Sequence, residues 1–210
     1  MQEFDHHRDG FPSLFVYNQV MADGKIIFIN GTSSSGKTSI LRALQKYLEE
    51  PYLEAGIDKF IWMLPERYLN RPLWDDVLGL ADKAGETGHV LVQGMHHAIA
   101  ALSEVGINVL ADHVLVEQSW VDHCVELFSE RPAYLIGVQC PLEVLEERKK
   151  NRKNRTLGQA RLQFPVIHKY TVYDLEVDTS VLTTDQCVRA ILARIKDPPE
   201  AFKRLKRQMI

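Results

Sequence analysis

Residues 31–38 read GTSSSGKT and match the phosphate-binding pattern G-x-x-x-x-G-K-[ST]. Glycines at both ends allow backbone angles that turn successive N–H groups inward, so the loop can surround an anion. The lysine can reach the β- and γ-phosphates of a nucleotide, and the threonine hydroxyl can ligate Mg²⁺. The alternative is a serine- and glycine-rich surface turn, but this pattern lies between a strand-like and a helical run, as a phosphate loop requires. The predicted nucleotide-binding residues are Gly31, Thr32, Ser33, Ser34, Ser35, Gly36, Lys37, Thr38 and Ser39.

A carboxylate follows in the segment YLEAGID, which we interpret as a short second strand ending at Asp58. At that position the side chain would face the γ-phosphate across the edge of the sheet. A carboxylate there could accept the proton of a substrate hydroxyl while its oxygen attacks phosphorus. Asp58 also precedes KFIWML, which looks helical, so it could instead be a helix N-cap. The residues alone leave both interpretations open.

A second carboxylate, Asp112, ends the apolar run NVLAD. It could hold a Mg²⁺-bound water, orient the acceptor, or serve as a turn carboxylate. Thr38 and Asp112 are therefore the candidate metal ligands, and the candidate acceptor-contacting residues are Asp58, Trp62, Met95 and Asp112. His96, His97 and His113 could also touch a substrate, although lone histidines in such segments are more often structural or solvated.

Three arginines, Arg148, Arg152 and Arg155, recur at intervals of four and three in EERKKNRKNR. On a helix they would share one face. Because phosphoryl transfer spreads negative charge over the γ-phosphoryl oxygens, arginines on a lid could stabilise it. We therefore predict Lys37, Asp58 and these arginines as catalytic. A solvated basic face or a small nucleic-acid patch is the alternative.

The elements that position these residues alternate along the chain. Apolar runs at 25–30, 52–58, 107–114, 133–140 and 173–180 indicate strands, and helical patterns lie between them. This alternation predicts an α/β fold with a five-stranded parallel sheet covered by helices on both faces, with ligands at the carboxyl ends of the strands. We predict an N-terminal arm (1–23), a kinase domain (24–197) with an acceptor-pocket insertion (62–88) and a lid (148–165), and a peripheral basic tail (198–210).

Composition narrows the functional class. A net charge of −3 argues against a general nucleic-acid or membrane binder, because neither polyanion would be attracted by the whole molecule. The three separated cysteines, Cys124, Cys140 and Cys187, are expected to be buried free thiols. The N-terminus lacks a signal-peptide pattern and no apolar run approaches a membrane span, so we expect a soluble cytoplasmic protein. Met21 could be a later natural start.

Other P-loop classes fit less well. A GTPase would show an NKxD-type guanine-reading element, which the sequence lacks, and a motor ATPase would show Asp-Glu at the end of a long apolar strand. Here Asp112 is followed by His113, so no neighbouring glutamate is available to activate water. These differences favour a small-molecule kinase.

The motifs together resemble the chloramphenicol phosphotransferase family of P-loop kinases. The matching elements are IIFINGTSSSGKTSILRALQ, GIDKF, VLADHV, GVQCPLEVLEERKKNRKNR and YDLEVDTS, in that order. The resemblance implies an ATP-dependent phosphotransferase with a shikimate- and nucleotide-kinase-like fold, using ATP and Mg²⁺ and a small-molecule hydroxyl acceptor. It implies Asp58 as the base, the arginines in or beside the lid, and adenine held near VDTSVLT. The segment 62–88, where the family shapes its acceptor pocket, matches least.

Two other functions remain as alternatives. One is a toxin-like kinase that phosphorylates a nucleotide sugar. The other is a nucleotide-dependent regulatory module whose basic lid and tail bind a partner or RNA. The acceptor and the oligomeric state are not predicted.

Overall fold

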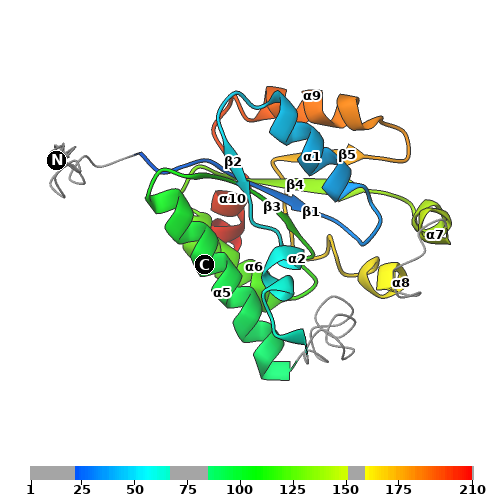
Figure 1. The fold of residues 1–210 in the computed structure, drawn as a ribbon, viewed down its shortest axis with the longest axis horizontal. Coiled ribbons are helices and arrows are strands. Elements are labelled where there is room, and N and C mark those ends of the chain that lie inside the picture. Colours follow the sequence, from blue (N-terminus) through cyan, green and yellow to red (C-terminus); the bar gives the residue numbers. More distant parts are fainter. Residues whose placement is uncertain (1–21, 67–84, 151–158, 210) are drawn as a thin grey trace, which may run out of the picture.

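The computed structural model describes residues 22–66, 85–150 and 159–209. The strands are β1 (Ile26–Asn30), β2 (Tyr52–Glu54), β3 (Asn108–His113), β4 (Ala133–Gln139) and β5 (Leu175–Asp178). The helices are α1 (Lys37–Tyr47), α2 (Ile57–Trp62), α5 (Gly85–Glu104), α6 (Gln118–Phe128), α7 (Leu142–Lys150), α8 (Gln159–Gln163), α9 (Thr184–Arg194) and α10 (Ala201–Gln208). Figure 1 shows how these helices surround the strands.

The strands form one sheet in the order β2-β3-β1-β4-β5, and each neighbouring pair is parallel. This confirms the predicted five-stranded parallel α/β sheet. The central strand β1 is buried along its whole length, as expected for a continuous apolar run covered on both faces. Asn30, its last residue, is in register with His113 of β3 and Gly137 of β4. The phosphate loop therefore leaves the sheet at the edge where the carboxyl ends of β1 and β3 meet.

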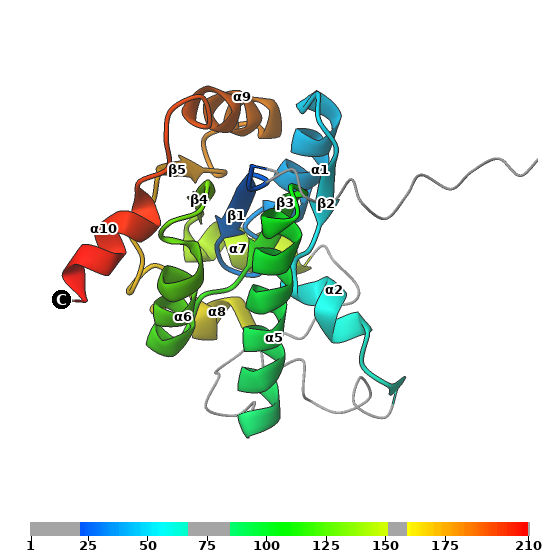
Figure 2. The same cartoon turned by 90° about the vertical axis from the view of Figure 1, so that its left-hand side faces the viewer.

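Helices cover both faces of the sheet (Figures 1 and 2). Alternate residues of β1 point to opposite faces, because strand side chains have a period of two. On one face Phe28 packs with Phe128 of α6, at a ring-centroid distance of 4.9 Å, and with residues of α5. On the other face Ile29 packs with residues of α1 and α9. The two cores hold the sheet edge, and thus the phosphate loop, in place.

The C-terminal segment, expected to be peripheral, contributes to the core. Ala201, Phe202 and Leu205 of α10 are buried, and the Phe202 ring lies 5.8 Å from the rings of both Phe28 and Phe128. The many basic residues of the segment make its apolar stripe difficult to recognise in the sequence. A few apolar side chains on one face are nevertheless enough to pack a short helix against the core. The tail prediction was therefore wrong about packing.

Several element boundaries differ from the prediction. The strand expected to run to Asp58 ends at Glu54, and α2 begins at Ile57. The helical run after the last strand suggests Thr184 as its cap, but the cap of α9 is Thr183, because Thr183 and Gln186 form a reciprocal capping box. Helix α5 starts at Gly85, inside the segment expected to be an insertion, and ends at Glu104, two residues before Gly106, whose φ is 83°. Residues 1–21, which include Met21 and most of the arm, and 67–84 lie outside the described residues.

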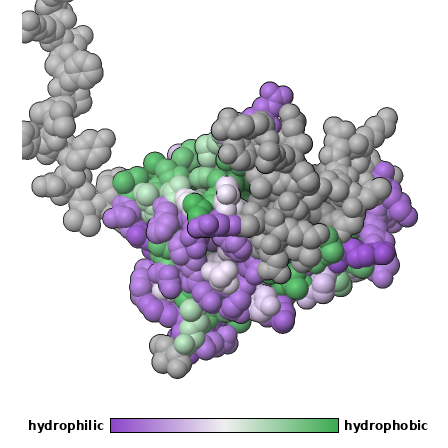
Figure 3. All heavy atoms as spheres, turned by 90° about the horizontal axis from the view of Figure 1, so that it is seen from below, coloured by the Kyte–Doolittle hydropathy of each residue, from purple (hydrophilic) through white to green (hydrophobic). Residues whose placement is uncertain are grey.

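Two expectations about the chain as a whole can be compared with the structure. Cys124, Cys140 and Cys187 are free and buried, as predicted. In the described part of the chain, no helix combines the length and the apolar character needed to span a bilayer. The face seen in Figure 3 carries mostly hydrophilic residues with smaller hydrophobic patches between them.

Candidate active site

The phosphate loop connects β1 to α1. Gly36 has a φ of 98°, a left-handed conformation that glycine adopts without steric cost. The helix α1 begins at the next residue, Lys37. Among the described residues no side chain caps this helix, so its partial positive charge at the loop favours an anion.

Lys37 lies across this loop. Its side chain is almost fully buried, and its Nζ donates hydrogen bonds to the carbonyl oxygens of Gly31 at 2.7 Å and Thr32 at 2.9 Å. The ammonium group is therefore held against the loop, where the sequence pattern places the β- and γ-phosphates.

The loop residues fit a phosphate group. The hydroxyl oxygens of Ser34 and Ser35 are buried, and the described residues offer neither of them a hydrogen-bond partner. Buried hydroxyl groups are normally paired, so these two donors suit an anionic oxygen inside the loop. Behind them Thr38 is half-buried and Ser39 is exposed.

Asp58 is the second residue of α2, rather than the end of a strand. The N-cap of this helix is Gly56, so Asp58 is neither a strand end nor the helix cap, and these two predicted positions were wrong. Its role as a base stays a prediction. The Asp58 side chain is half-buried. A carboxylate in the first turn of a helix is stabilised by the helix dipole.

Asp112 lies against the start of the same helix. A Cβ atom added to Gly56 would be 1.7 Å from Asp112 Oδ1, so the carboxylate occupies the space a side chain would need. Burial raises the pKa of Asp112, the nearby Lys37 ammonium opposes this, and the Asp58 and Glu54 carboxylates raise it further. The structure thus brings Lys37, Asp58 and Asp112 into one electrostatic neighbourhood beside the loop.

The close approach at Gly56 gives a stability prediction. We expect Gly56→Ala to destabilise the protein by about 1–3 kcal/mol, because the methyl group collides with Asp112. Gly94 is the matched control: it lies within α5 and an added Cβ would meet nothing within 4 Å. Gly94→Ala should stabilise the protein by about 0.5–1 kcal/mol, because alanine favours the helix. Urea unfolding of both variants measures the difference, and equal midpoints would contradict the packing argument.

The donor types of Thr38 and Asp112 suit a Mg²⁺ ion whose remaining ligands come from a nucleotide and water. Thr38 and Asp112 offer one hydroxyl and one carboxylate. Within the described ranges, no group of three or more His, Cys, Asp or Glu side chains is placed to hold a metal ion. Mg²⁺ typically takes one or two protein ligands together with phosphate oxygens and water, so a sparse donor set is what it requires.

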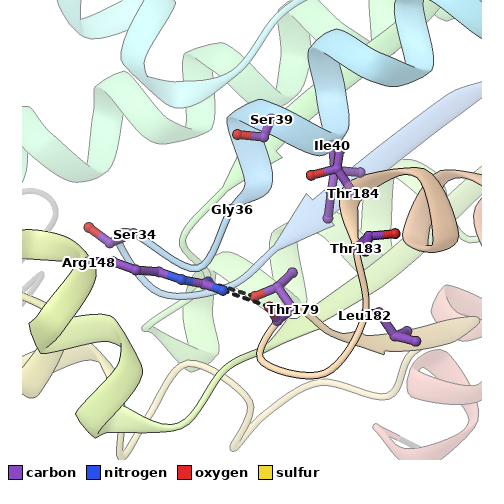
Figure 4. A pocket seen from close by; sticks show the side chains of 9 residues that line it. All are labelled: Ser34, Gly36, Ser39, Ile40, Arg148, Thr179, Leu182, Thr183 and Thr184. Atoms are coloured by element: carbon purple, nitrogen blue, oxygen red, sulfur yellow. Dashed lines mark hydrogen bonds between the residues drawn. The ribbon is translucent and has the colours of Figure 1, made fainter.

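Arg148, in α7, closes the other side of the loop (Figure 4). Its guanidinium donates to the Thr179 hydroxyl at 2.9 Å and to the Thr179 carbonyl at 2.6 Å. The Thr179 hydroxyl in turn donates to the carbonyl of Ser35 in the loop at 2.7 Å. Arg148 and Thr179 border a pocket of about 490 Å³ that lies between the loop, α7 and residues 179–184. Of the three predicted arginines, Arg148 borders this pocket, and Arg152 and Arg155 lie outside the described residues.

The other predicted acceptor residues are placed differently. Trp62, at the end of α2, is exposed. Met95 is fully buried in the core with Ile61 and Ile99, so the structure assigns it to packing. Its position was inferred from the segment alone, and α5 turns it inward.

Two of the histidines lie in a buried hydrogen-bonded chain. His113 Nδ1 accepts from the Val114 N–H at 2.7 Å, so its proton is on Nε2 and is donated to His96 Nε2 at 2.7 Å. His96 therefore carries its proton on Nδ1 and donates it to His123 Nδ1 at 2.9 Å. Burial, with the Lys37 charge, lowers the pKa of His113 to about 3. Burial, with its neighbouring imidazoles, also lowers the pKa of His96. This chain supports the structural interpretation for His96 and His113, whereas His97 is exposed.

These shifts predict that acid destabilises the fold. The His113 pKa is near 6.5 in the unfolded chain and about 3 when folded, so its contribution is complete above pH 6.5 and decreases as the pH falls toward 3. By pH 5 the loss from this residue should reach about 2 kcal/mol. Urea unfolding at pH 7.5 and pH 5.0 tests this: His113→Gln should lose less stability between the two pH values than the wild type. Equal losses would contradict it.

The sequence patterns did not identify three residues whose contacts shape this site. Gly56 admits Asp112, Thr179 links Arg148 to the loop, and Gln163 of α8 accepts a hydrogen bond from the Ser33 N–H at 2.7 Å. Gly56 and Thr179 lie in segments that the sequence already singled out, GID and VDTS. No local pattern points to Gln163, because its partner is 130 residues away.

Known proteins resemble this chain over most of its length. A family model described as "Chloramphenicol phosphotransferase-like protein" matches residues 24–196. A Mycobacterium tuberculosis protein named "Putative O-phosphotransferase" is 31% identical over 205 residues, covering 90% of this chain and 91% of the relative. A sugar kinase from Janibacter sp. is 16% identical with a TM-score of 0.63, covering 82% of this chain and 95% of its own. A gluconokinase from Sinorhizobium meliloti is 19% identical with a TM-score of 0.60, covering 84% and 93%.

The two solved structures are too distant in sequence to show more than a shared fold. The family model and the mycobacterial relative are evidence of family membership as well. Each match covers most of this chain, including the phosphate loop, Asp58 and Asp112. On this basis the chain belongs to the chloramphenicol phosphotransferase-like family and is a phosphotransferase of the P-loop kinase type.

Proposed function

We propose that this chain transfers the γ-phosphoryl group of ATP to a hydroxyl group of a small molecule. The observation that carries the proposal is the grouping of Lys37, Asp58 and Asp112 beside the phosphate loop. A cation against the loop suits the phosphate donor. A carboxylate in the first turn of α2, with Asp112 of β3 beside the start of that helix, suits a hydroxyl acceptor.

In the proposed reaction Asp58 is the general base. Its carboxylate accepts the proton of the acceptor hydroxyl while the hydroxyl oxygen forms a bond to the γ-phosphorus. The bond from the γ-phosphorus to the bridging oxygen breaks, and ADP leaves with the electron pair. Asp112 is the second carboxylate of the site, and we propose that it orients either the acceptor or a metal-bound water.

The negative charge of the phosphates is balanced from three directions in this proposal. Lys37 and the N–H groups at the start of α1 contact the β- and γ-phosphates. Thr38 and Asp112 would hold Mg²⁺, which neutralises phosphate charge when it is bound. Arg148 borders the pocket between the loop and residues 179–184, where we place the nucleoside part of ATP.

The charge of the acceptor side favours one class of substrate. Asp58, Asp112 and Glu54 together make this side acidic. Burial is the main cause of the raised pKa of Asp112, and the Asp58 and Glu54 charges raise it further. An anionic acceptor would be repelled there. We therefore expect a neutral hydroxyl compound, such as a chloramphenicol-like antibiotic, to be phosphorylated faster than a nucleotide sugar.

The proposal can be tested by an ATP-consumption screen of hydroxylated antibiotics, nucleosides, sugars and nucleotide sugars. Asp58→Asn protein is the blank for each compound. A compound that causes ATP consumption with the wild type but not with the variant, and that gains one phosphoryl group by mass spectrometry, supports the proposal. Consumption that is identical in both proteins for every accepted compound would exclude Asp58 as the base.

A further inference from the structure

Gln163 connects α8 to the phosphate loop. Its side chain is fully buried, and its Oε1 accepts a hydrogen bond from the backbone N–H of Ser33 at 2.7 Å. Ser33 is the third residue of the phosphate pattern, so this contact reaches the loop itself rather than a neighbouring element. A side chain 130 residues further along the chain thus accepts a hydrogen bond from a backbone N–H of the loop.

A second contact joins the same segment to the residue that precedes the loop. The Ile167 carbonyl accepts from Asn30 Nδ2 at 3.0 Å, and the Ile167 N–H donates to the Gln163 carbonyl at 2.9 Å. The Asn30 side chain is itself oriented, because its Oδ1 accepts from the Leu115 N–H at 2.8 Å. Residues 163–167 therefore form a turn that is closed by a backbone hydrogen bond. Further hydrogen bonds join this turn to Asn30, at the end of β1, and to Ser33, in the phosphate loop.

Because Ser33 is buried, its N–H needs an acceptor, and a buried backbone donor without one is costly. With Gln163 in place, this donor is directed to a protein oxygen and the conformation of the first half of the loop is set. The Thr179 hydroxyl does the same for the Ser35 carbonyl in the second half. The two contacts shape the loop before any phosphate is bound, which lowers the entropy lost on binding.

We propose that Gln163 is a positioning residue for the phosphate donor: its amide oxygen orders the phosphate loop through the Ser33 N–H. This inference rests on the proposed function of the loop as a nucleotide site. It assigns Gln163 to donor binding and not to the acceptor side, where Asp58 and Asp112 lie.

The test is nucleotide binding to Gln163→Met, which keeps the length of the side chain and removes the acceptor oxygen. Isothermal titration calorimetry with Mg²⁺ and ADP should give about tenfold weaker binding than the wild type, since a lost buried hydrogen bond is of that order. Adenosine, which lacks the phosphates, should bind both proteins equally. Hydrogen exchange of the Ser33 amide, followed by NMR, should be faster in the variant.

Gln118→Met is the matched control, because Gln118 bonds to Asp122 on the surface of α6, and ADP affinity should not change. Unchanged ADP affinity in Gln163→Met would overturn the inference while leaving the proposed function intact. Tighter ADP binding would also overturn it, because Gln163 would then compete with phosphate. An equal loss of ADP and adenosine affinity would show general damage and would count against it. Failure of the wild type to bind ADP would overturn the proposed function and this inference with it.

Discussion

Asp58→Asn should keep nucleotide affinity and lower kcat by about 10²–10⁴-fold, the usual contribution of a general base. Asparagine has nearly the same size and still occupies the first turn of α2, but it cannot accept a proton from the acceptor hydroxyl. Steady-state kinetics with an acceptor found in the screen measure kcat, and calorimetry with ADP measures nucleotide binding. The expected pattern is a large loss in kcat with a nucleotide Kd within about twofold of the wild type.

The matched control for this variant is Asp185→Asn. Asp185 is an exposed aspartate in the first turn of α9, so the change removes the same charge from an equivalent helix position. Asp185 follows Thr184, which lines the pocket assigned to the nucleoside, but Asp185 does not line that pocket itself. Both variants should lose a few tenths of a kcal/mol of stability through the helix dipole. Only Asp58→Asn should lose activity. A variant with full kcat would show that Asp58 orients the acceptor without taking its proton, or does neither.

Lys37→Ala should lose both nucleotide binding and turnover. In the structure the Lys37 ammonium is buried against the loop and bonded to the carbonyls of Gly31 and Thr32. Its removal takes away the loop cation that can meet the β- and γ-phosphates. We expect about 10- to 100-fold weaker binding of ADP with Mg²⁺, the range for a lost hydrogen bond to a charged group. We also expect kcat to fall by about 10²–10³-fold, as for other lost transition-state donors.

Lys46→Ala provides the comparison on the same helix. Lys46 is exposed in the last turn of α1, away from the loop, so its removal should affect only the helix dipole. Nucleotide affinity and kcat should match those of the wild type. If Lys37→Ala bound ADP as tightly as Lys46→Ala, the loop could not be the main phosphate site, and the assignment of the donor half would have to be abandoned.

The two variants separate the halves of the proposed site. We expect Asp58→Asn to affect the chemical step alone, and Lys37→Ala to affect both donor binding and the step that follows. In the proposed reaction the two residues act on different substrates, yet their charges both influence Asp112. Their effects on kcat are therefore not expected to add independently, and the double variant should lose less than the product of the single losses.

Much of the donor half could be predicted from the sequence. The pattern GTSSSGKT, the apolar run before it and the helical run after it are local features, and they specify a loop between a strand and a helix. The alternating strands and helices predicted the parallel sheet, because parallel strands need crossover connections that the intervening helices provide. Arg148 was predicted from its spacing to the other arginines, and in the structure it borders the pocket beside the loop.

The acceptor half could not be predicted in the same way. YLEAGID has the composition of a strand, but β2 stops at Glu54 and α2 begins three residues later, with its N-cap at Gly56, where Asp112 needs the space. Met95 has the position of a candidate contact in the sequence but faces the core. Short apolar segments are compatible with strand or helix, so packing against the rest of the fold decides between them.

The contacts that complete the site join residues far apart in the chain. Gly56 meets Asp112, Thr179 meets Ser35, and Gln163 meets Ser33. None of these pairs leaves a periodic trace in the sequence, because each depends on where separate elements meet at the carboxyl edge of the sheet. Local patterns were enough to identify a phosphate loop and its sheet. The environment of Asp58 and Asp112, and the role of Gln163, follow from burial and hydrogen bonding that exist only once the chain has folded.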